Sequence, residues 1–436
     1  MKFSINTLFF TLVAMNELLT VVRTLPKPDD AAEPIFMDAP SYESSVDDTD
    51  DGDDEDFSGD FETPEHDAPH RVRNEIWKVN INHTKAEDLF QGDMRLDLVQ
   101  KMELKIDRIY RQKRAARSRE KEYLWKHNTV YYKIDSGFSR DTKMELKRGI
   151  RHWKKSLKHC LKFVRLDKTP GTEESISKQR FGGGPVDHIL FTKTNSGCWS
   201  QVGRTDTRIN QFPYVPGRQL ISIGEGCGEK GTVIHEIGHA IGFWHEQSRR
   251  DRDSFVKIVR HNIMSGQKLQ FRRLSKKDVN SMGYAYDFWS IMHYGPTFFS
   301  KNGKPTIRIQ KKYRYLKPEI GQRRVLSYLD VAQVRAMYKC NVLPSRESTR
   351  TCVSKKTKGR DYRGKLDYTE KGVMCQPWNK KYPHSHKYKL SNKADGLGRH
   401  NHCRNPGGEK ERPWCFTTYG KDRSTWQYCD IKTCDS

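Results

Sequence analysis

Apolar and polar residues follow different patterns in successive parts of the chain. A short apolar run at residues 9–14 follows the N-terminal Met-Lys. It predicts a signal peptide at residues 1–24, since it is too short to span a membrane. The acidic stretch 47–60 has no apolar period, which predicts disorder. Residues 115–340 alternate apolar strand-like runs with helical stretches, so this part can form a large core. We therefore expect a secreted, extracellular chain with no membrane span.

Changes in composition mark three further boundaries. Residues 25–114 contain no cysteine and end in Arg-Gln-Lys-Arg, and we interpret them as a propeptide. The basic tetrad resembles the site of a furin-type convertase, and its position predicts activating cleavage after Arg114. Residues 341–351 are polar and predict a linker. Residues 352–434 are rich in Cys, Gly, Trp and Tyr, which predicts a small domain held by disulfides.

The cysteines and the net charge indicate in which compartment the protein folds and which classes of partner it can bind. None of the ten cysteines precedes Cys160, and their even number in dense groups predicts disulfides formed in an oxidising compartment. The formal net charge is +24, but secretion argues against nucleic acid as a partner. The alternatives are a solvated surface and attraction to acidic glycans or matrix. The sequence Asn82-His-Thr is a sequon, so Asn82 is a candidate glycosylation site.

The strongest chemical signal is the sequence HEIGHAIGFWH, which begins at His235. His235 and His239 are four residues apart, so a helix places both imidazoles on one face, where they can share a cation. Glu236 can reach a metal-bound water, and Gly242 permits a turn that returns His245 as a third ligand. Three neutral imidazoles with one open position suit a single catalytic Zn²⁺. An accidental pair of surface histidines is the alternative, but five specified residues match by chance with odds of about one in ten thousand.

Two further segments resemble a known family. Residues 243–253 read Phe-Trp-His-Glu-Gln-Ser-Arg-Arg-Asp-Arg-Asp, which resembles the signature of the astacin family of zinc metallo-endopeptidases. Residues 290–294, Ser-Ile-Met-His-Tyr, resemble the Met-turn of that family. The resemblance implies that Met292 forms an apolar floor beneath the metal and that Tyr294 is a displaceable zinc ligand. It also implies an α+β catalytic domain, in which a mixed sheet and the helix of His235 lie on either side of a cleft that holds zinc.

The same resemblance extends to the presumed propeptide and its removal. Residues 90–93, Phe-Gln-Gly-Asp, resemble a motif in which an aspartate occupies the water position of zinc, so Asp93 is the implied inhibitory ligand. An aspartate in an ordinary turn is the alternative, because the bare motif is weak. Cleavage would expose Ala115, whose α-amino group the family buries beside the residue that corresponds to Glu246. A buried ammonium and a buried carboxylate need each other, so Glu246 is expected to be structural.

Disulfide pairing is implied by resemblance, because spacing alone does not determine it. The astacin-like segments 196–204 and 222–227 imply the pairs Cys198–Cys227 and Cys160–Cys340. The last six cysteines lie in motifs that resemble a kringle, among them Gln-Pro-Trp after Cys375 and Pro-Trp before Cys415. The kringle resemblance implies the pairs Cys352–Cys434, Cys375–Cys415 and Cys403–Cys429.

Kringles are binding modules, and their best-known ligand is a lysine side chain. Such a site needs paired carboxylates for the ammonium and aromatic rings for the methylene stem. The rings are present at Trp414, Phe416 and Trp426. The acids are reduced to Glu409 and Glu411, and Lys410 and Arg412 next to them would oppose an ammonium. We therefore expect docking to a substrate or to matrix, with an inert spacer as the alternative.

Together these features predict an extracellular zinc metallo-endopeptidase that is made as a zymogen and acts on proteins or peptides. Glu236 would take a proton from the metal-bound water, and Tyr294 would donate a hydrogen bond to the developing oxyanion. The astacin resemblance implies a preference for acidic residues just after the cleaved bond, through Arg308, Lys311 or, as the first choice, Lys317, although exposed lysines are usually only solvated. The alternative is a non-catalytic adhesion or glycan-binding scaffold, and the presence of Glu236 argues against it.

Overall fold

The strands and helices lie within the residues that the computed structural model describes. These are residues 76–83, 89–96, 100–101, 104, 123–158, 160–168, 171–180, 183–193, 197–205, 216–275, 280–340, 352–354, 356–391, 393–420 and 423–434. Five features predicted from the sequence lie outside them: the signal peptide at residues 1–24, the acidic stretch 47–60, Arg114, Ala115 and the linker at residues 341–351. Among the described residues, no helix is long and apolar enough to cross a membrane.

The regular elements are short and numerous. The α-helices are α2 (Ile76–His83), α4 (Arg140–Ser156), α5 (Thr172–Arg180), α6 (Lys230–Ala240) and α7 (Tyr328–Met337). The strands are β1 (Met94–Arg95), β2 (Thr129–Ile134), β3 (Lys162–Arg165), β4 (His188–Thr192), β5 (Cys198–Gln201), β6 (Arg218–Ile223), β7 (Val256–Ile258), β8 (Ile307–Ile309), β9 (Trp414–Phe416) and β10 (Trp426–Tyr428). The 3-10 helices are η3 (Lys126–Asn128), η4 (Glu246–Ser248), η5 (Arg252–Ser254), η6 (Arg260–Asn262), η7 (Gln267–Phe271), η8 (Lys311–Leu316), η9 (Lys393–Asp395) and η10 (Pro406–Gly408).

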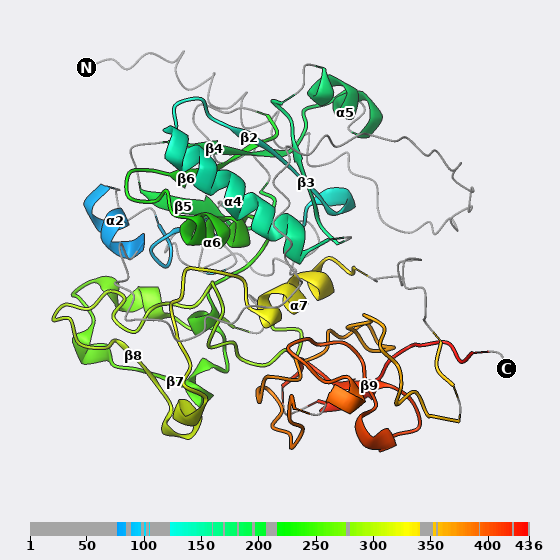
Figure 1. The fold of residues 1–436 in the computed structure, drawn as a ribbon. Helices are drawn as coiled ribbons and strands as arrows, with labels where there is room; N and C mark the ends of the chain where they lie inside the picture. The colour runs from blue at the N-terminus through cyan, green and yellow to red at the C-terminus, as the bar shows by residue number, and fades with distance from the viewer. Residues whose placement is uncertain are drawn as a thin grey trace, which may run out of the picture. The chain divides into compact units, whose positions relative to one another are not determined.

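Six strands form one mixed sheet in the order β1-β5-β6-β4-β2-β3 (Figure 1). The strands β2, β3, β4 and β6 run parallel, β5 runs antiparallel to β6, and β1 runs parallel to β5. In this register Tyr131 of β2 lies opposite His188 of β4. The inner strands bury Ile189, Phe191 and Ile221 almost completely, and these side chains share one face of the sheet, because residues two apart on a strand point the same way and Phe191 pairs with Ile221. The expected mixed sheet of an α+β fold is confirmed.

Helices α4 and α6 pack against each other and against this sheet. The indole of Trp153 in α4 donates to the carbonyl of Ile234 in α6 over 3.0 Å. Gly149 allows this close approach, because a Cβ at that position would lie 2.6 Å from a methyl carbon of Val233. Every residue of α6 from Gly231 to Ala240 is buried. The helix that carries His235 and His239 is therefore fixed by packing on all sides.

After α6 the chain forms a second half of the central domain (residues 123–340) with little regular structure. Gly242 has a φ of 117°, which glycine adopts readily and other residues do not, and it turns the chain out of α6. Helix α7 begins at Ser327 with a capping box that Asp330 completes, so both side chains bind orphan backbone N–H groups. The disulfide Cys160–Cys340 joins the segment after α7 to the segment before β3.

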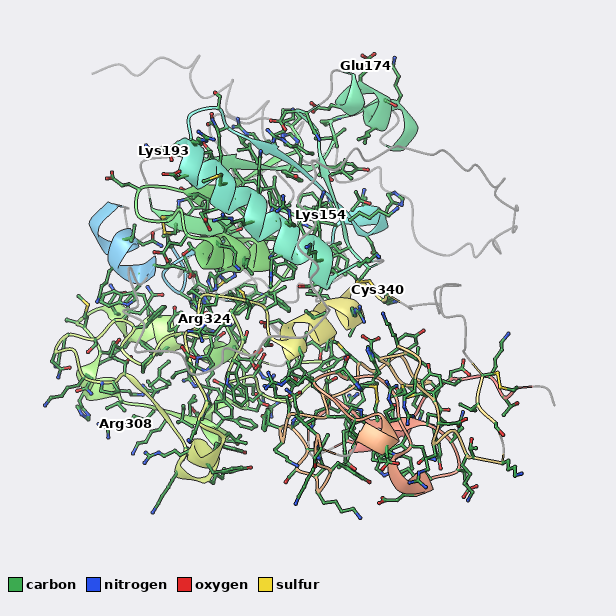
Figure 2. The ribbon with its side chains drawn as sticks, viewed as in Figure 1. Lys154, Glu174, Lys193, Arg308, Arg324 and Cys340 are labelled. Carbon is green, nitrogen blue, oxygen red and sulfur yellow. A yellow bond between two sulfur atoms is a disulfide. The ribbon has the colours of Figure 1, made fainter. Side chains whose placement is uncertain are left out.

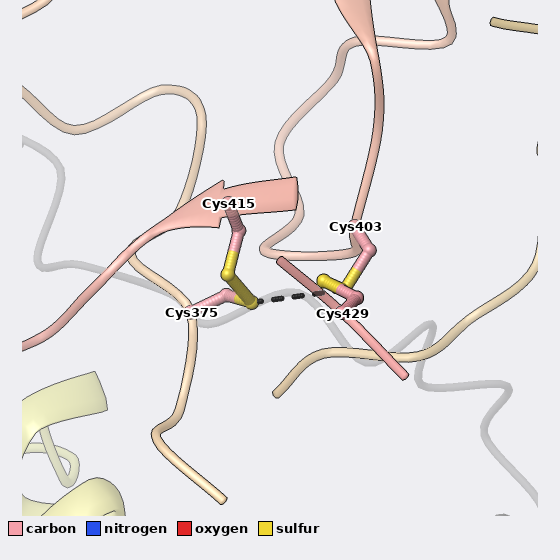
Figure 3. A group of neighbouring side chains, drawn as sticks. All are labelled: Cys375, Cys403, Cys415 and Cys429. Atoms are coloured by element: carbon pink, nitrogen blue, oxygen red, sulfur yellow. Dashed lines mark hydrogen bonds between the residues drawn. A yellow bond between two sulfur atoms is a disulfide. The ribbon is translucent and has the colours of Figure 1, made fainter. Parts of the chain in front are cut away.

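The C-terminal module (residues 352–434) is held by three disulfides, Cys352–Cys434, Cys375–Cys415 and Cys403–Cys429. These and the bridges Cys160–Cys340 and Cys198–Cys227 are the five pairs that the resemblances implied. Figure 3 shows two of the bridges side by side, with the sulfur atoms of Cys375 and Cys403 3.9 Å apart. These four sulfurs are close enough together to hold a metal ion. All four are oxidised, however, so the group offers no thiolate to a cation.

The C-terminal module packs against the segment 283–289 of the central domain, and both belong to the same compact unit. Tyr382 of the module is buried in the core of the central domain, and its hydroxyl donates to the carbonyl of Tyr286 over 2.6 Å. The carbonyl of Tyr382 accepts from the hydroxyl of Tyr328 in α7. Two main-chain hydrogen bonds add to the contact, from Ala285 N to Thr418 O and from Gly420 N to Gly283 O. The module is thus docked on the central domain as well as covalently joined to it.

We predict that Tyr382→Ala lowers the thermal stability of the central domain as well as that of the C-terminal module. The variant removes a buried ring and the hydrogen bond to Tyr286, so its melting temperature should fall by roughly 5–10 °C. Tyr315→Ala is the matched control, because Tyr315 is 70% exposed and should leave the melting temperature almost unchanged. Differential scanning calorimetry makes the comparison. If the parent and Tyr382→Ala had the same melting temperature, the docking of the module on the central domain would be contradicted.

Candidate zinc centre

Helix α6 supplies two imidazoles in a fixed orientation. His235 and His239 are fully buried, and each Nδ1 lies 2.8 Å from a main-chain carbonyl, that of Ile291 for His235 and that of Phe243 for His239. A carbonyl oxygen only accepts, so Nδ1 carries the proton in both rings and Nε2 presents a lone pair. Burial lowers the pKa of His235 well below its usual value, which keeps the imidazole neutral. Both rings therefore offer the atom that a metal binds.

The third imidazole comes from the segment that follows α6. The turn at Gly242 brings His245 back beside the helix, with its ring centroid 4.7 Å from that of His239 and 5.4 Å from that of His235. Its Nδ1 lies 3.1 Å from the amide oxygen of Gln91, which again places the proton on Nδ1. Burial lowers the pKa of His245 to about 4. All three imidazoles thus present an unprotonated Nε2.

The carboxylate of Asp93 faces these three nitrogens. It lies 3.1 Å from Nε2 of His235, 3.1 Å from that of His245 and 3.6 Å from that of His239. One ligand atom of each residue lies within 4.8 Å of the others, and the Nε2 of His239 and the Oδ1 of Asp93 are buried without a hydrogen-bond partner. Three lone pairs and a carboxylate that face one another without a proton need a cation between them. Ligands at about 2.1 Å from a tetrahedral zinc ion are roughly 3.3 Å apart, so the donor set and its spacing fit zinc.

Glu236 lies next to the first histidine and has no hydrogen-bond partner in the part of the chain that the structure describes. Both of its carboxylate oxygens are buried without a hydrogen-bond partner. Burial, and then the negative charge of Asp93, raise the pKa of Glu236 well above its usual value. An unpartnered buried carboxyl is costly to a fold. Its position therefore suits a group that exchanges a proton with a bound water or substrate.

The segment 290–294 contacts the metal centre through Met292 and Tyr294. Met292 is buried against α6, since a Cβ on Gly238 would lie 2.6 Å from its sulfur. The ring of Tyr294 has its centroid 4.8 Å from that of His245, and its hydroxyl donates to the carbonyl of Gln91 over 2.6 Å. The structure thus brings both residues to the centre, with the hydroxyl of Tyr294 engaged by the segment that carries Asp93.

The segment 89–96 enters the centre through a tight turn. Gly92 has a φ of +80°, and a Cβ there would lie 2.7 Å from the ring of Phe299. Asn80 of α2 anchors the turn, because its amide donates to the carbonyl of Gly92 over 2.6 Å and accepts from the N–H of Cys198 over 2.7 Å. The candidate glycosylation residue Asn82 lies in the same helix. After the turn, β1 continues the sheet beside β5.

Glu246 is paired within the central domain. Its carboxylate accepts from Nη1 of Arg249 over 3.0 Å and from the main-chain N–H of Asp287 over 2.7 Å. Burial raises the pKa of Glu246 to about 7, and the charge of Arg249 opposes this shift. Arg249 also donates to two carbonyls of the segment 283–289. Ala115 lies outside the described residues, so its pairing with Glu246 stays a prediction.

Arg323 belongs to the centre although the sequence analysis missed it. Its guanidinium is buried and donates from Nη1 to the carbonyl of His293 over 3.0 Å, whereas Nε and Nη2 have no hydrogen-bond partner among the described residues. Burial lowers the pKa of Arg323 to about 10, and the charges of Asp93 and Glu236 oppose the shift, so the side chain stays cationic. No motif spacing marks this arginine. The basic residues expected to line the substrate pocket are exposed instead: Arg308 (Figure 2), Lys311 and Lys317.

The expectation that the sheet and the zinc-binding helix lie on either side of a cleft is wrong. Helix α6 packs against β5 and β6, so helix and sheet form the same side of the centre. A helix that is apolar on nearly all faces needs such cover. The other side comes from aromatic rings of the second half, where Phe271, Phe298 and Phe299 surround the ring of Tyr294.

Comparison with known proteins agrees with this geometry. The sequence model of the Astacin peptidase family matches residues 117–339, and that of the Kringle domain matches residues 352–434. Tolloid-like protein 1 of Homo sapiens is 39% identical over 228 residues, which are 52% of this chain and 20% of that protein. Bone morphogenetic protein 1 of Xenopus laevis is 40% identical over 230 residues, which are 52% of this chain and 29% of that protein. The chain thus spans less than a third of the length of these relatives.

Among solved structures, high choriolytic enzyme 1 of Oryzias latipes, a hatching enzyme zinc-protease, is 28% identical with a TM-score of 0.41. The match covers 52% of this chain and 99% of that one. The astacin match covers more than half of the chain, including the three histidines, Glu236 and the segment 290–294. The chain therefore belongs to the astacin family of peptidases, and a kringle domain follows its peptidase domain.

Proposed function

We propose that this chain is a secreted zinc metallo-endopeptidase, made as a zymogen, that hydrolyses internal peptide bonds of extracellular proteins. The observation that carries the proposal is the convergence of three unprotonated Nε2 atoms beside the unpartnered carboxyl of Glu236. His235, His239 and His245 would hold one zinc ion. When bound, zinc supplies Lewis acidity and an acidified water.

The chain's own groups account for proton transfer and substrate orientation. Glu236 takes a proton from the attacking water and later delivers one to the leaving amine. The hydroxyl of Tyr294, once Gln91 has left, donates to the negative charge that develops on the scissile carbonyl oxygen. The edge of β5 that β1 occupies is available to an extended substrate once β1 has left.

We infer that the precursor is latent because of Asp93. Its carboxylate faces the three histidines and would take the ligand position that the attacking water needs. Gln91 strengthens the block, because its side chain engages His245 and its carbonyl engages Tyr294. Cleavage after Arg114 by a convertase would release this segment. The new α-amino group of Ala115 would then join the buried carboxylate of Glu246, which has Arg249 as its cationic partner in the precursor.

Arg323 supports a preference for acidic substrates. Two of its guanidinium nitrogens are buried without an acceptor, and a buried unpaired cation is unfavourable. A carboxylate side chain next to the cleaved bond would pair with it. We therefore assign the acidic preference to Arg323 in place of Arg308, Lys311 or Lys317.

The kringle is proposed to dock substrate or matrix and not to bind lysine. The ammonium of Lys410 lies 3.4 Å from the ring centroid of Trp426 and 5.1 Å from that of Trp414, so the chain's own cation covers the aromatic face. Glu409 is already engaged, by Lys387 at 3.3 Å and by the hydroxyl of Tyr388 at 2.7 Å. Acidic glycans or matrix remain proposed partners because of the net charge of +24.

A non-catalytic adhesion or glycan-binding scaffold is the competing function. It would explain the charge and the kringle, but it has no use for Glu236, whose burial without a partner opposes folding. It also leaves the contact between Asp93 and three histidines unexplained. The centre therefore favours an enzyme.

Glu236→Gln should abolish hydrolysis while zinc stays bound. The amide keeps the size of the side chain but cannot take the proton, so turnover of a quenched peptide should fall by roughly 10²- to 10⁴-fold. Zinc content is measured by atomic absorption on the same sample. Glu225→Gln, at an exposed position, is the matched control. Full activity of Glu236→Gln would sink the mechanism, and chelator-resistant hydrolysis by the parent would exclude zinc.

Asp93→Ala should make the uncleaved precursor active. The change opens the fourth ligand position, so the precursor should cleave the quenched peptide without prior processing at Arg114, at roughly a tenth or more of the processed rate. Leu96→Ala is the control, because Leu96 is buried in the same segment but contributes no ligand atom. If both variants gained activity equally, loosening of the segment and not loss of a ligand would explain latency.

Arg323→Leu should weaken the preference for an acidic residue after the cleaved bond. The ratio of kcat/KM for two peptides that differ only by Asp or Ala at that position should fall by about tenfold or more. Arg324→Leu is the matched control, because Arg324 is paired with Glu319 over 2.6 Å at the surface and should leave the ratio unchanged. An unaltered ratio in Arg323→Leu would remove this assignment.

A further inference from the structure

The second half of the central domain contains a cavity of about 740 Å³ with a cationic lining, which we call the cationic cavity. It lies around η6 and η7, and its charged lining residues include Arg250, Arg260, Lys268, Arg272 and Arg273. A smaller cavity of about 290 Å³ shares Arg260 and Arg273 with it and extends to Lys257 in β7. The two cavities form one positively charged depression.

This charge is only partly neutralised by the protein. Asp253 pairs with Arg252 and with Arg273, at 2.9 Å in each case. The remaining four charged side chains make no ion pair with a carboxylate in the described part of the chain: Arg250, Arg260, Lys268 and Arg272. Four cations gathered without counter-charges repel one another. An anionic ligand would relieve that repulsion.

The hairpin beside the cavity shows the same excess of positive charge. Lys257 of β7 lies directly opposite Arg308 of β8 in the antiparallel register, and both side chains are exposed. Like charges directly opposite on a strand pair destabilise it. The hairpin therefore tolerates an unfavourable pair at the edge of the cationic cavity, where it extends the positive field.

The cavity is apolar as well as charged. Phe271, Ile263 and Leu274 line it beneath the cations, and Leu269 at its border is 72% exposed. A sulfated polysaccharide would meet the charges but has no group for an exposed leucine. A polypeptide with both acidic and apolar side chains would meet both. The lining therefore favours an acidic, leucine-containing peptide.

The cavity also shares a wall with the zinc centre. The ring of Phe271 has its centroid 5.8 Å from that of Tyr294. The carbonyl of Arg272 accepts from the side-chain amide of Gln91 over 3.4 Å, and Gln91 is two residues from Asp93. An extended chain advances about 3.3 Å per residue. A polypeptide held at the zinc centre thus reaches the cationic cavity within a few residues.

We propose that the cationic cavity binds an acidic segment, interspersed with apolar residues, of the polypeptide substrate a few residues from the cleaved bond. This deepens the proposed endopeptidase function and rests on it. Guanidinium groups bind carboxylates through paired hydrogen bonds. A single exposed ion pair contributes little to the free energy of binding, so recognition requires several acidic residues together. The affinity is expected to fall as salt is added. Arg323 would select the residue beside the bond, and the cationic cavity would select a more distant sequence.

Binding is tested first, without catalysis, on the full-length precursor. The probe is a fluorescein-labelled peptide of repeated Glu-Leu-Glu units, compared with Gln-Leu-Gln and Glu-Ser-Glu peptides by fluorescence anisotropy. The double variant Arg260→Glu/Lys268→Glu should raise Kd for Glu-Leu-Glu by about tenfold or more. The control Lys301→Glu/Lys304→Glu makes the same change in charge at exposed lysines outside the cavity lining and should change Kd less than about twofold. Arg260→Gln/Lys268→Gln repeats the test if the charge reversal does not fold.

Hydrolysis is tested second, on the processed chain, with a short peptide and with the same peptide extended on either side by Glu-Leu-Glu. The cavity variants should lower kcat/KM for one extended substrate and leave the short one unchanged. Equal Kd values for the cavity and control variants would overturn the proposal. So would a cavity-dependent affinity for heparin together with cavity-independent binding of the peptide, since that result describes a polysaccharide site. Failure to cleave any peptide would refute the endopeptidase function, whereas the anisotropy result would still decide what the cavity binds.

Discussion

The ligand set of the centre depends on the hydrogen bonds that fix the tautomers of the three imidazoles. Each Nδ1 must meet an acceptor so that each Nε2 keeps its lone pair. For His235 and His239 the acceptors are main-chain carbonyls of the central domain, whereas for His245 the acceptor is the side chain of Gln91. The first two ligands are thus set permanently by the fold. The third is oriented by the segment that also carries Asp93, so in the proposed activation His245 would need a new acceptor once that segment has left.

The carbonyl that orients His235 belongs to the segment 290–294, and this makes the position of that segment critical. The preceding segment 283–289 receives hydrogen bonds from two directions. Arg249, the partner of Glu246, donates to two of its carbonyls, and Tyr382 of the kringle donates to the carbonyl of Tyr286. The kringle therefore supports the same stretch of chain that leads into Met292. In this structure the kringle thus contributes to the packing of the peptidase domain.

The sequence predicted the parts of the centre that depend on local spacing. His235, Glu236 and His239 lie on one short helix, and the return of His245 needs only the turn at Gly242, so a single motif contained most of the ligand set. The mixed sheet and the disulfide pairs followed from resemblance. Arg323 could not be found in this way, because it reaches the centre through tertiary packing and no local pattern distinguishes it from the other arginines.

Tertiary contacts also explain why the position of α6 was predicted wrongly and why two polar residues near the centre were not assigned roles. The arrangement of helix and sheet was mistaken because burial of α6 on all sides is a property of the packed domain and not of the motif that the helix carries. Asn80 and Gln91 were not assigned roles because their partners lie far away in sequence, at Cys198 for Asn80 and at His245 and Tyr294 for Gln91. Contacts of this kind become visible only in three dimensions.

The parallel pairing of β1 with β5 has a consequence for solubility. In the precursor β1 forms the border of the sheet, and its two residues cover the main chain of β5. An uncovered strand at the border of a sheet is a template on which another chain can add and aggregate. If residues 25–114 act as the proposed propeptide, the segment of β1 would therefore cover this border during folding as well as inhibit the centre. The proposed processing after Arg114 would uncover the main chain of β5, so the same step that admits an extended polypeptide would also make the protein prone to self-association.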